Sequence, residues 1–217
     1  MTDAEAVNAG VWNNARRGVL EVHERLERVG FVIGHGVILL PAPGFMKDGR
    51  TEDGVLHVPD ERDDGLGVQL EVRVLDEGGD GAVSGDEGAA QYGGLLDRWE
   101  AYHGRRGTSR FAVAVAQGAR LGGAVVDGEE IELVNTLANE GTLLRTLNGD
   151  RAKLARAVSA RLGVEVFEPT AVGIDQRGID VRTRTSVMRV RAAERLGGPS
   201  ALAFVEELLR EGEGRHG

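Results

Sequence analysis

The sequence predicts an α+β fold: a mixed, largely antiparallel sheet or sheets of about eight strands, with a long N-terminal helix and two C-terminal helices. Helical and extended patterns follow one another without the strict alternation that builds a parallel sheet. Residues 68–75 alternate apolar and polar side chains, which indicates a strand with one face in water. Because only 4% of the residues are aromatic, the core must be built mainly from aliphatic side chains.

The longest predicted helix covers residues 3–29. Its apolar residues recur three or four positions apart, which places them on one helix face: Val11, Ala15, Val19, Val22, Leu26 and Val29. Shorter helices are predicted at residues 95–103 and 150–162. The last helix begins at Pro199 and ends before Gly212. Its buried face is predicted to contain Leu202, Val205 and Leu209.

Extended patterns predict the strands. They are expected at residues 31–33, 37–40, 55–58, 68–75, 111–116, 124–126, 130–134, 164–167 and 179–190. The run at 111–116 is apolar throughout, so we expect it to be buried on both faces. Asp127 and Gly128 predict a two-residue hairpin turn between the strands at 124–126 and 130–134.

The chain has 217 residues, enough for one large or two small domains. We expect a helix-plus-sheet domain with long acidic, glycine-rich loops in residues 1–118. Residues 119–217 form a smaller α+β part that either continues this domain or is a second one. The absence of cysteine excludes disulfides, thiolate metal sites and cysteine nucleophiles. No apolar run is long enough for a membrane span and no signal-peptide pattern is present, so we expect a soluble protein of the cytoplasm or a virion, without a membrane partner.

Charge is unevenly distributed along the chain. Residues 40–90 contain thirteen acidic and four basic residues, so their net charge of −9 equals that of the whole chain. A later segment is rich in arginine, and four of its residues are predicted to form an interface: Arg182, Arg184, Arg189 and Arg191. Opposite charges on one chain allow copies to dock head to tail, closing into a ring or continuing as a tube.

The leading hypothesis is therefore a non-catalytic structural or assembly subunit that forms a homo-oligomer. A ring or tube protein of a viral tail or connector would be an example of this architecture. The expected partners are copies of the chain or other protein subunits. The acidic net charge does not favour a nucleic-acid partner, and we expect no cofactor.

An alternative hypothesis is a Mg²⁺-dependent nuclease. Asp60 follows the predicted strand at 55–58, and Glu71 and Arg73 lie two positions apart on the next strand. This arrangement resembles the core of the PD-(D/E)xK nucleases, and the resemblance covers residues 3–116. It implies that Asp60 and Glu71 hold Mg²⁺, and that Arg73 stands where the family has a lysine that positions the attacking water. Because arginine stays protonated, it is a poor replacement for that lysine.

A second alternative is a weak calcium-stabilised binding module. Residues 76–87 follow much of the spacing of an EF-hand loop, in which oxygen atoms converge on a hard cation. The ligands would be the side chains or carbonyls of Asp76, Asp80, Ala82, Ser84 and Glu87. Gly78 offers no side chain at the third position of the loop. We therefore expect any calcium affinity to be weak, about 10⁻⁴–10⁻³ M.

Overall fold

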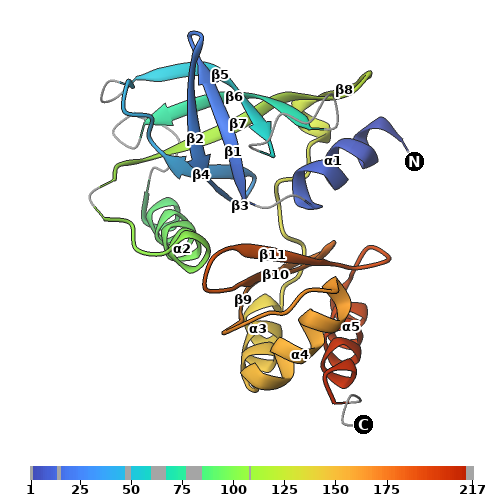
Figure 1. Ribbon diagram of the computed structural model, residues 1–217. Helices are drawn as coiled ribbons and strands as arrows, with labels where there is room; N and C mark the ends of the chain where they lie inside the picture. The colour runs from blue at the N-terminus through green and yellow to red at the C-terminus, as the bar shows by residue number, and fades with distance from the viewer. Residues whose placement is uncertain are drawn as a thin grey trace. The chain divides into compact units, whose positions relative to one another are not determined.

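The computed structural model describes residues 2–13, 16–46, 50–59, 67–76, 85–107 and 109–213. The chain divides into two compact units, unit 1 (Met1–Val134) and unit 2 (Asn135–Gly217), each with its own hydrophobic core (Figure 1). Unit 1 contains an eight-stranded sheet and unit 2 a three-stranded one. The predicted α+β class with largely antiparallel sheets is therefore confirmed. The boundary considered from the sequence, after residue 118, falls inside a strand of unit 1.

Unit 1 is a curled antiparallel sheet with two α-helices. Its elements are α1 (Asp3–Asn13), β1 (Arg17–Val22), β2 (Arg25–Gly30), β3 (Val32–Gly34), β4 (Val37–Pro41), β5 (Thr51–Val58), β6 (Val68–Asp76), α2 (Gly85–His103), β7 (Phe111–Leu121), β8 (Ala124–Asp127) and the 3-10 turn η1 (Gly128–Glu130). The strand order is β2-β1-β5-β6-β7-β4-β3, and β8 pairs with β7. Only Phe31 separates β2 from β3, so one bent strand supplies both ends of this order and the sheet curls around its core.

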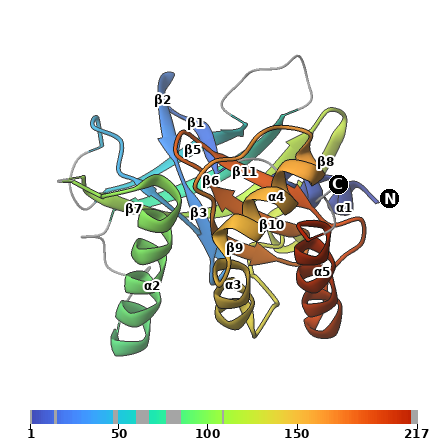
Figure 2. The same cartoon turned by 60° about the horizontal axis from the view of Figure 1, so that its bottom comes forward.

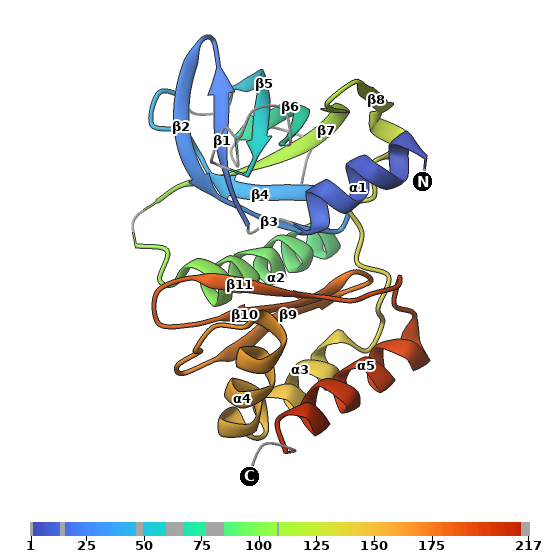
Figure 3. The same cartoon turned by 45° about the vertical axis from the view of Figure 1, so that its right-hand side comes forward.

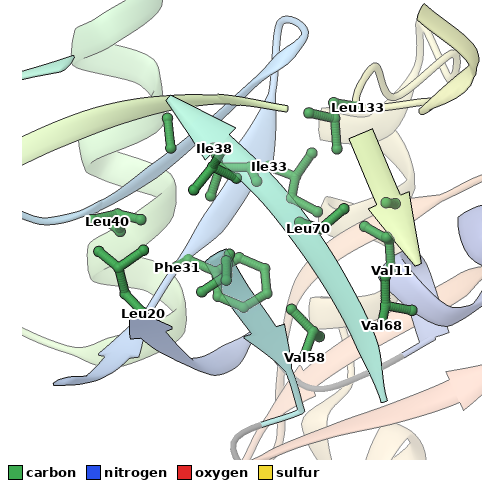
Figure 4. Packing of buried hydrophobic residues seen from close by; sticks show 14 of the residues in the cluster. Val11, Leu20, Phe31, Ile33, Ile38, Leu40, Val58, Val68, Leu70 and Leu133 are labelled. Atoms are coloured by element: carbon green, nitrogen blue, oxygen red, sulfur yellow. The ribbon is translucent and has the colours of Figure 1, made fainter. Parts of the chain in front are cut away.

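Alternation of apolar side chains builds the core inside the curl. In β6, Val68, Leu70, Val72 and Val74 are fully buried while Gln69, Glu71 and Arg73 are exposed, as the sequence predicts. Buried side chains of the other strands complete this core, with Phe31 at its centre (Figure 4). The predicted strand at 111–116 is the first part of β7, and its first four residues are buried.

Helix α1 covers part of this core through Val7, Val11 and Trp12, which are at most 1% exposed. The side-chain amide of Asn8 donates to the Glu130 carbonyl at 2.9 Å, and its oxygen accepts from the Glu132 N–H at 2.8 Å. The Trp12 indole N–H donates to the Glu132 carbonyl at 2.5 Å. These side chains fix α1 to the extended backbone that follows β8.

The predicted long helix at 3–29 is wrong beyond residue 13. Residues 17–30 form the hairpin β1–β2, in which Val19, Val22 and Val29 are buried from strands rather than from one helix face. The β-branched residues favour the extended conformation. The turn consists of His23 and Glu24, both with positive φ (48° and 63°), as a two-residue hairpin loop requires. The usual Asn-Gly signal is absent there, which is why the sequence pattern did not reveal the turn.

Three further strand predictions are wrong. The strand expected at residues 130–134 is absent, because the chain turns earlier, at residues 122–123 between β7 and β8, and residues 128–130 form η1. Residues 164–167 form no strand. The long strand expected at 179–190 is a hairpin of two strands, which turns at residues 183–186.

Unit 2 packs three helices on a small antiparallel sheet. Its elements are α3 (Glu140–Asn148), α4 (Arg151–Leu162), β9 (Thr170–Asp175), β10 (Gly178–Arg182), β11 (Val187–Arg191) and α5 (Gly198–Glu211), with strand order β11-β10-β9. The three helices lie on one side of the sheet (Figures 2 and 3). Asp150 caps α4 by accepting from the Lys153 N–H, and Gly163 ends it with φ 69°. Of the apolar residues predicted to be buried in the last helix, Val205 is buried but Leu202 is 44% exposed.

Side chains cover the outer edge of β9. The Asn148 amide donates to the Ala171 carbonyl and accepts from the Ala171 N–H, each at 2.9 Å. At Ile174, Asn135 donates to the carbonyl at 2.7 Å and Glu140 accepts from the N–H at 3.4 Å. Because these backbone groups already have partners, this edge cannot pair with a further strand without losing them.

Gly10 permits the close approach of α1 to β6, and this predicts the effect of replacing it. A Cβ atom at residue 10 would lie 2.4 Å from Cγ2 of the buried Val68. Gly10→Ala should therefore lower the free energy of unfolding by about 1–2 kcal/mol despite the better helix propensity of alanine. Gly93→Ala in α2 is the matched control, because a Cβ atom there would meet nothing within 4 Å beyond the neighbouring backbone of its own helix, and it should raise the free energy of unfolding by about 1 kcal/mol. Urea denaturation measures both, and equal effects would contradict the packing role of Gly10.

Candidate functional site

The exposed face of β1, β5, β6 and β7 carries charged side chains that are paired across the strands. The pairs are Glu21–His57 (3.0 Å), Asp53–Arg73 (3.0 Å) and Glu71–Arg120 (3.2 Å). Glu52 projects to the opposite side of β5 from Asp53 and contacts His23 of the β1–β2 turn at 2.7 Å. Exposed pairs of this kind stabilise a fold by at most about 1 kcal/mol each. Asp53 and Glu71 thus each lie beside an arginine of opposite charge on a neighbouring strand.

The residues of the nuclease hypothesis lie in or next to this face. Glu71 and Arg73 are both exposed on β6, and each contacts a residue of opposite charge, Arg120 and Asp53 respectively. Asp60 lies outside the described residues. The structure thus places Glu71 and Arg73 on one face without joining them to a common point.

The residues of the calcium hypothesis are mostly outside the described part of the chain. Asp76 is the last residue of β6 and Glu87 lies in the first turn of α2. Asp80, Ala82 and Ser84 are not described. Among the residues that the structure does describe, no three His, Asp or Glu side chains are grouped so that they could hold a metal ion.

Helix α2 is attached to the bent strand through two aromatic residues. The Trp99 indole N–H donates to the Gly30 carbonyl at 3.0 Å, and His103 Nε2 lies 3.1 Å from the Phe31 carbonyl. Since a carbonyl can only accept, His103 must carry a proton on Nε2. Trp99 also packs edge-on against Phe111, with ring centroids 4.9 Å apart.

Burial lowers the pKa of His103. Its bond to the Phe31 carbonyl acts in the opposite direction, and the nearby positive charges of Arg17 and Arg16 lower the pKa further. The neutral imidazole with its proton on Nε2 is therefore the form that fits between α2 and the sheet. The sequence pattern did not identify this contact, because it joins residues far apart in the chain.

Unit 2 contains a buried group of three charges that the sequence did not reveal. Arg189 donates from Nη2 to Asp175 at 2.6 Å and from Nη1 to Asp180 at 2.8 Å, and all three side chains are at most 5% exposed. Burial alone would lower the pKa of Arg189, but the carboxylates of Asp180 and Asp175 outweigh it and raise that pKa. The guanidinium thus stays charged and joins the three strands β9, β10 and β11.

The predicted basic interface is therefore divided by the structure. The Arg189 side chain points inward to its two aspartates. Arg184 is exposed in the turn between β10 and β11, next to the half-buried Arg182, and Arg191 is exposed at the far end of β11. Arg184 and Arg191 are thus the exposed members of the predicted set.

The boundary between the units also divides the charge. Unit 1 contains thirteen basic and twenty-four acidic residues, a net charge of −11, whereas unit 2 contains thirteen basic and eleven acidic residues, a net charge of +2. Separately, no helix in the described part of the chain is long and apolar enough to cross a membrane.

Comparison with known proteins adds information on the fold alone. No protein-family model and no curated protein matches the chain. Among solved structures, a protein of unknown function from Agrobacterium tumefaciens is 14% identical, with a TM-score of 0.62 and coverage of 94% of each chain. A heme binding protein from Mycobacterium smegmatis is 21% identical over 98% of each chain, with a TM-score of 0.43. The first likeness shows a shared α+β fold, and the second superposes too poorly to support a conclusion.

The buried charges of unit 2 predict that replacing Arg189, which contacts both aspartates, strongly lowers the free energy of unfolding. Arg189→Leu would remove the guanidinium that contacts both buried carboxylates, Asp175 and Asp180, so the free energy of unfolding should fall by about 3–5 kcal/mol. Arg184→Leu in the exposed turn is the control and should change it by no more than about 0.5 kcal/mol. Thermal and urea unfolding at neutral pH measure both. A small effect of Arg189→Leu would show that the three charges contribute little to stability.

The contact of His103 predicts a pH dependence. Because the folded-state pKa lies below the ordinary value, the folded protein binds fewer protons than the unfolded chain as the pH falls below about 6.5. The contribution of His103 is therefore complete above that pH and is lost as the pH falls towards its folded pKa. Urea denaturation at pH 7.5 and 5.5 should show a smaller loss for His103→Gln than for the unmodified protein. The same loss in both proteins would contradict the prediction, and an NMR titration of the His103 ring gives a direct check.

Proposed function

We propose that this chain is a non-catalytic assembly subunit that associates with copies of itself through opposite charges. The observation that carries the proposal is the division of charge between the units, −11 on unit 1 and +2 on unit 2. The basic partner in each contact is the β10–β11 turn with Arg182 and Arg184. The acidic partner is unit 1, in which most of the acidic excess belongs to residues 40–90.

A contact between two different surfaces is heterologous, so it repeats from copy to copy. Such contacts produce a ring when the rotation closes and a filament or tube when it does not. A ring or tube of this kind is the architecture suggested for a viral tail or connector. Complementary charge mainly accelerates association and selects the partner, and its effect is screened within about 8–10 Å at physiological salt.

The two metal-dependent alternatives have less support. In the nuclease hypothesis, Glu71 and Arg73 are each next to a residue of opposite charge on a neighbouring strand. In the calcium hypothesis, the departure at Gly78 leaves the loop with few ligands. We therefore place the nuclease and calcium hypotheses below the proposal of an assembly subunit.

Reversing the charge of the hairpin turn tests the proposal. Arg182→Glu together with Arg184→Glu should lower the assembled mass, measured by light scattering at low salt, because the acidic unit 1 would then repel the turn. High salt should lower the mass of the unmodified protein in the same way. The far-UV spectrum should not change.

Arg151→Glu together with Arg210→Glu is the matched control. Both arginines are exposed on helices of unit 2, and the double change alters the net charge by the same amount. It should leave most of the assembled mass intact. If both double variants lower the mass equally, net charge rather than the hairpin turn governs association. If the unmodified protein is monomeric at low salt, the proposal is wrong.

A further inference from the structure

Strand β2 has an open edge. Among the described strands it pairs with β1 only, and it stands at one end of the strand order, as Figure 3 shows. The register places Val22 opposite Arg25 on either side of a two-residue turn, so the backbone groups of Arg25, Glu27 and Val29 point towards β1. Those of Leu26 and Arg28 point outward. Within the described residues, neither Leu26 nor Arg28 makes a backbone hydrogen bond on that side.

The side chains of this edge are also accessible. Leu26 is 52% exposed, and Glu24, Arg25 and Arg28 are exposed beside it. The edge of β9 differs, because the side chains of Asn148, Asn135 and Glu140 occupy its backbone groups. Charged residues on an edge normally oppose pairing with other strands. In β2, however, the order of the charged residues makes the edge complementary to a second copy of itself.

The sequence Glu24-Arg25-Leu26-Glu27-Arg28 is complementary to itself in the antiparallel direction. When two copies are aligned about Leu26, each Arg25 lies opposite a Glu27, each Glu24 lies opposite an Arg28, and the two Leu26 side chains meet. Directly opposite residues of an antiparallel pair share a face, so these contacts can form. Alignment about Glu27 or about Arg25 would instead place two like charges opposite each other. The charges therefore select one register.

We propose that β2 pairs with β2 of a second copy of this chain, antiparallel and about a two-fold axis at Leu26. The outward N–H and C=O of each Leu26 then bond to those of Leu26 of the second copy, and the two unit 1 sheets become continuous. Arg25 and Glu27 are suited to this role because both project to one face, where the Arg25 guanidinium lies 5.7 Å from the Phe45 ring and Glu27 accepts from the Gly44 N–H at 3.2 Å. This interface is isologous and closes at the dimer.

This interface is distinct from the head-to-tail contact of the proposed function. The test therefore uses the Arg182→Glu/Arg184→Glu protein, in which that contact is weakened. Its mass is measured by sedimentation from about 10 μM to about 1 mM, since pairing along one short strand gives a weak dimer. We expect a monomer–dimer equilibrium. A protein that stays monomeric over this range would overturn the inference but not the proposed function.

Charge exchange identifies the register. Arg25→Glu alone opposes two glutamates twice in each dimer, and Glu27→Arg alone opposes two arginines twice. Each should weaken dimerisation about ten- to hundredfold. The double variant Arg25→Glu/Glu27→Arg restores opposite charges and should restore dimerisation. An equimolar mixture of the two single variants should form a mixed dimer. Melting temperatures show that each variant is folded, and failure of both the double variant and the mixture to dimerise would contradict the proposed register.

Discussion

The fold of unit 1 depends on the continuity of β2 and β3 through Phe31. The Phe31 N–H donates to the Arg16 carbonyl at 3.0 Å, which extends the β1–β2 ladder, while its ring is fully buried among the core side chains. Immediately after it, β3 pairs with β4 at the other end of the strand order. One strand thus joins both ends of the sheet. Without that bend, the alternating apolar faces of β5, β6 and β7 would have no opposite wall to pack against.

The same bend is where α2 attaches. Trp99 and His103 donate to consecutive carbonyls, those of Gly30 and Phe31, at the point where the strand leaves one partner for the other. A Cβ atom on Gly30 would lie 2.8 Å from the His103 ring, so the absence of a side chain there permits the contact. Backbone carbonyls at a bend have fewer strand partners than those inside a ladder, and the helix satisfies them.

Buried and exposed charges have different roles in the two units. On the face of unit 1, the pairs Asp53–Arg73 and Glu71–Arg120 join adjacent strands and remain in contact with water, so each contributes little to stability. In unit 2, Arg189 and its two aspartates are removed from water, and the guanidinium brings a positive charge to both buried carboxylates. The net charge that remains beyond these internal pairs differs in sign between the units.

The sequence alone predicts the α+β class, the alternation of β6, the apolar part of β7, the strands at residues 31–33 and 37–40 and the helices α4 and α5, because in each case neighbouring residues carry the pattern. It could not determine the β1–β2 hairpin, since apolar residues three or four positions apart favour a helix and the turn at His23 and Glu24 lacks glycine. Nor could it show that Arg189 points inward while Arg184 does not. Both belong to one arginine-rich run, and only the pairing of β9, β10 and β11 brings Asp175 and Asp180 to the same guanidinium. Such contacts depend on strand register, which is set by the packing of the whole sheet rather than by adjacent residues.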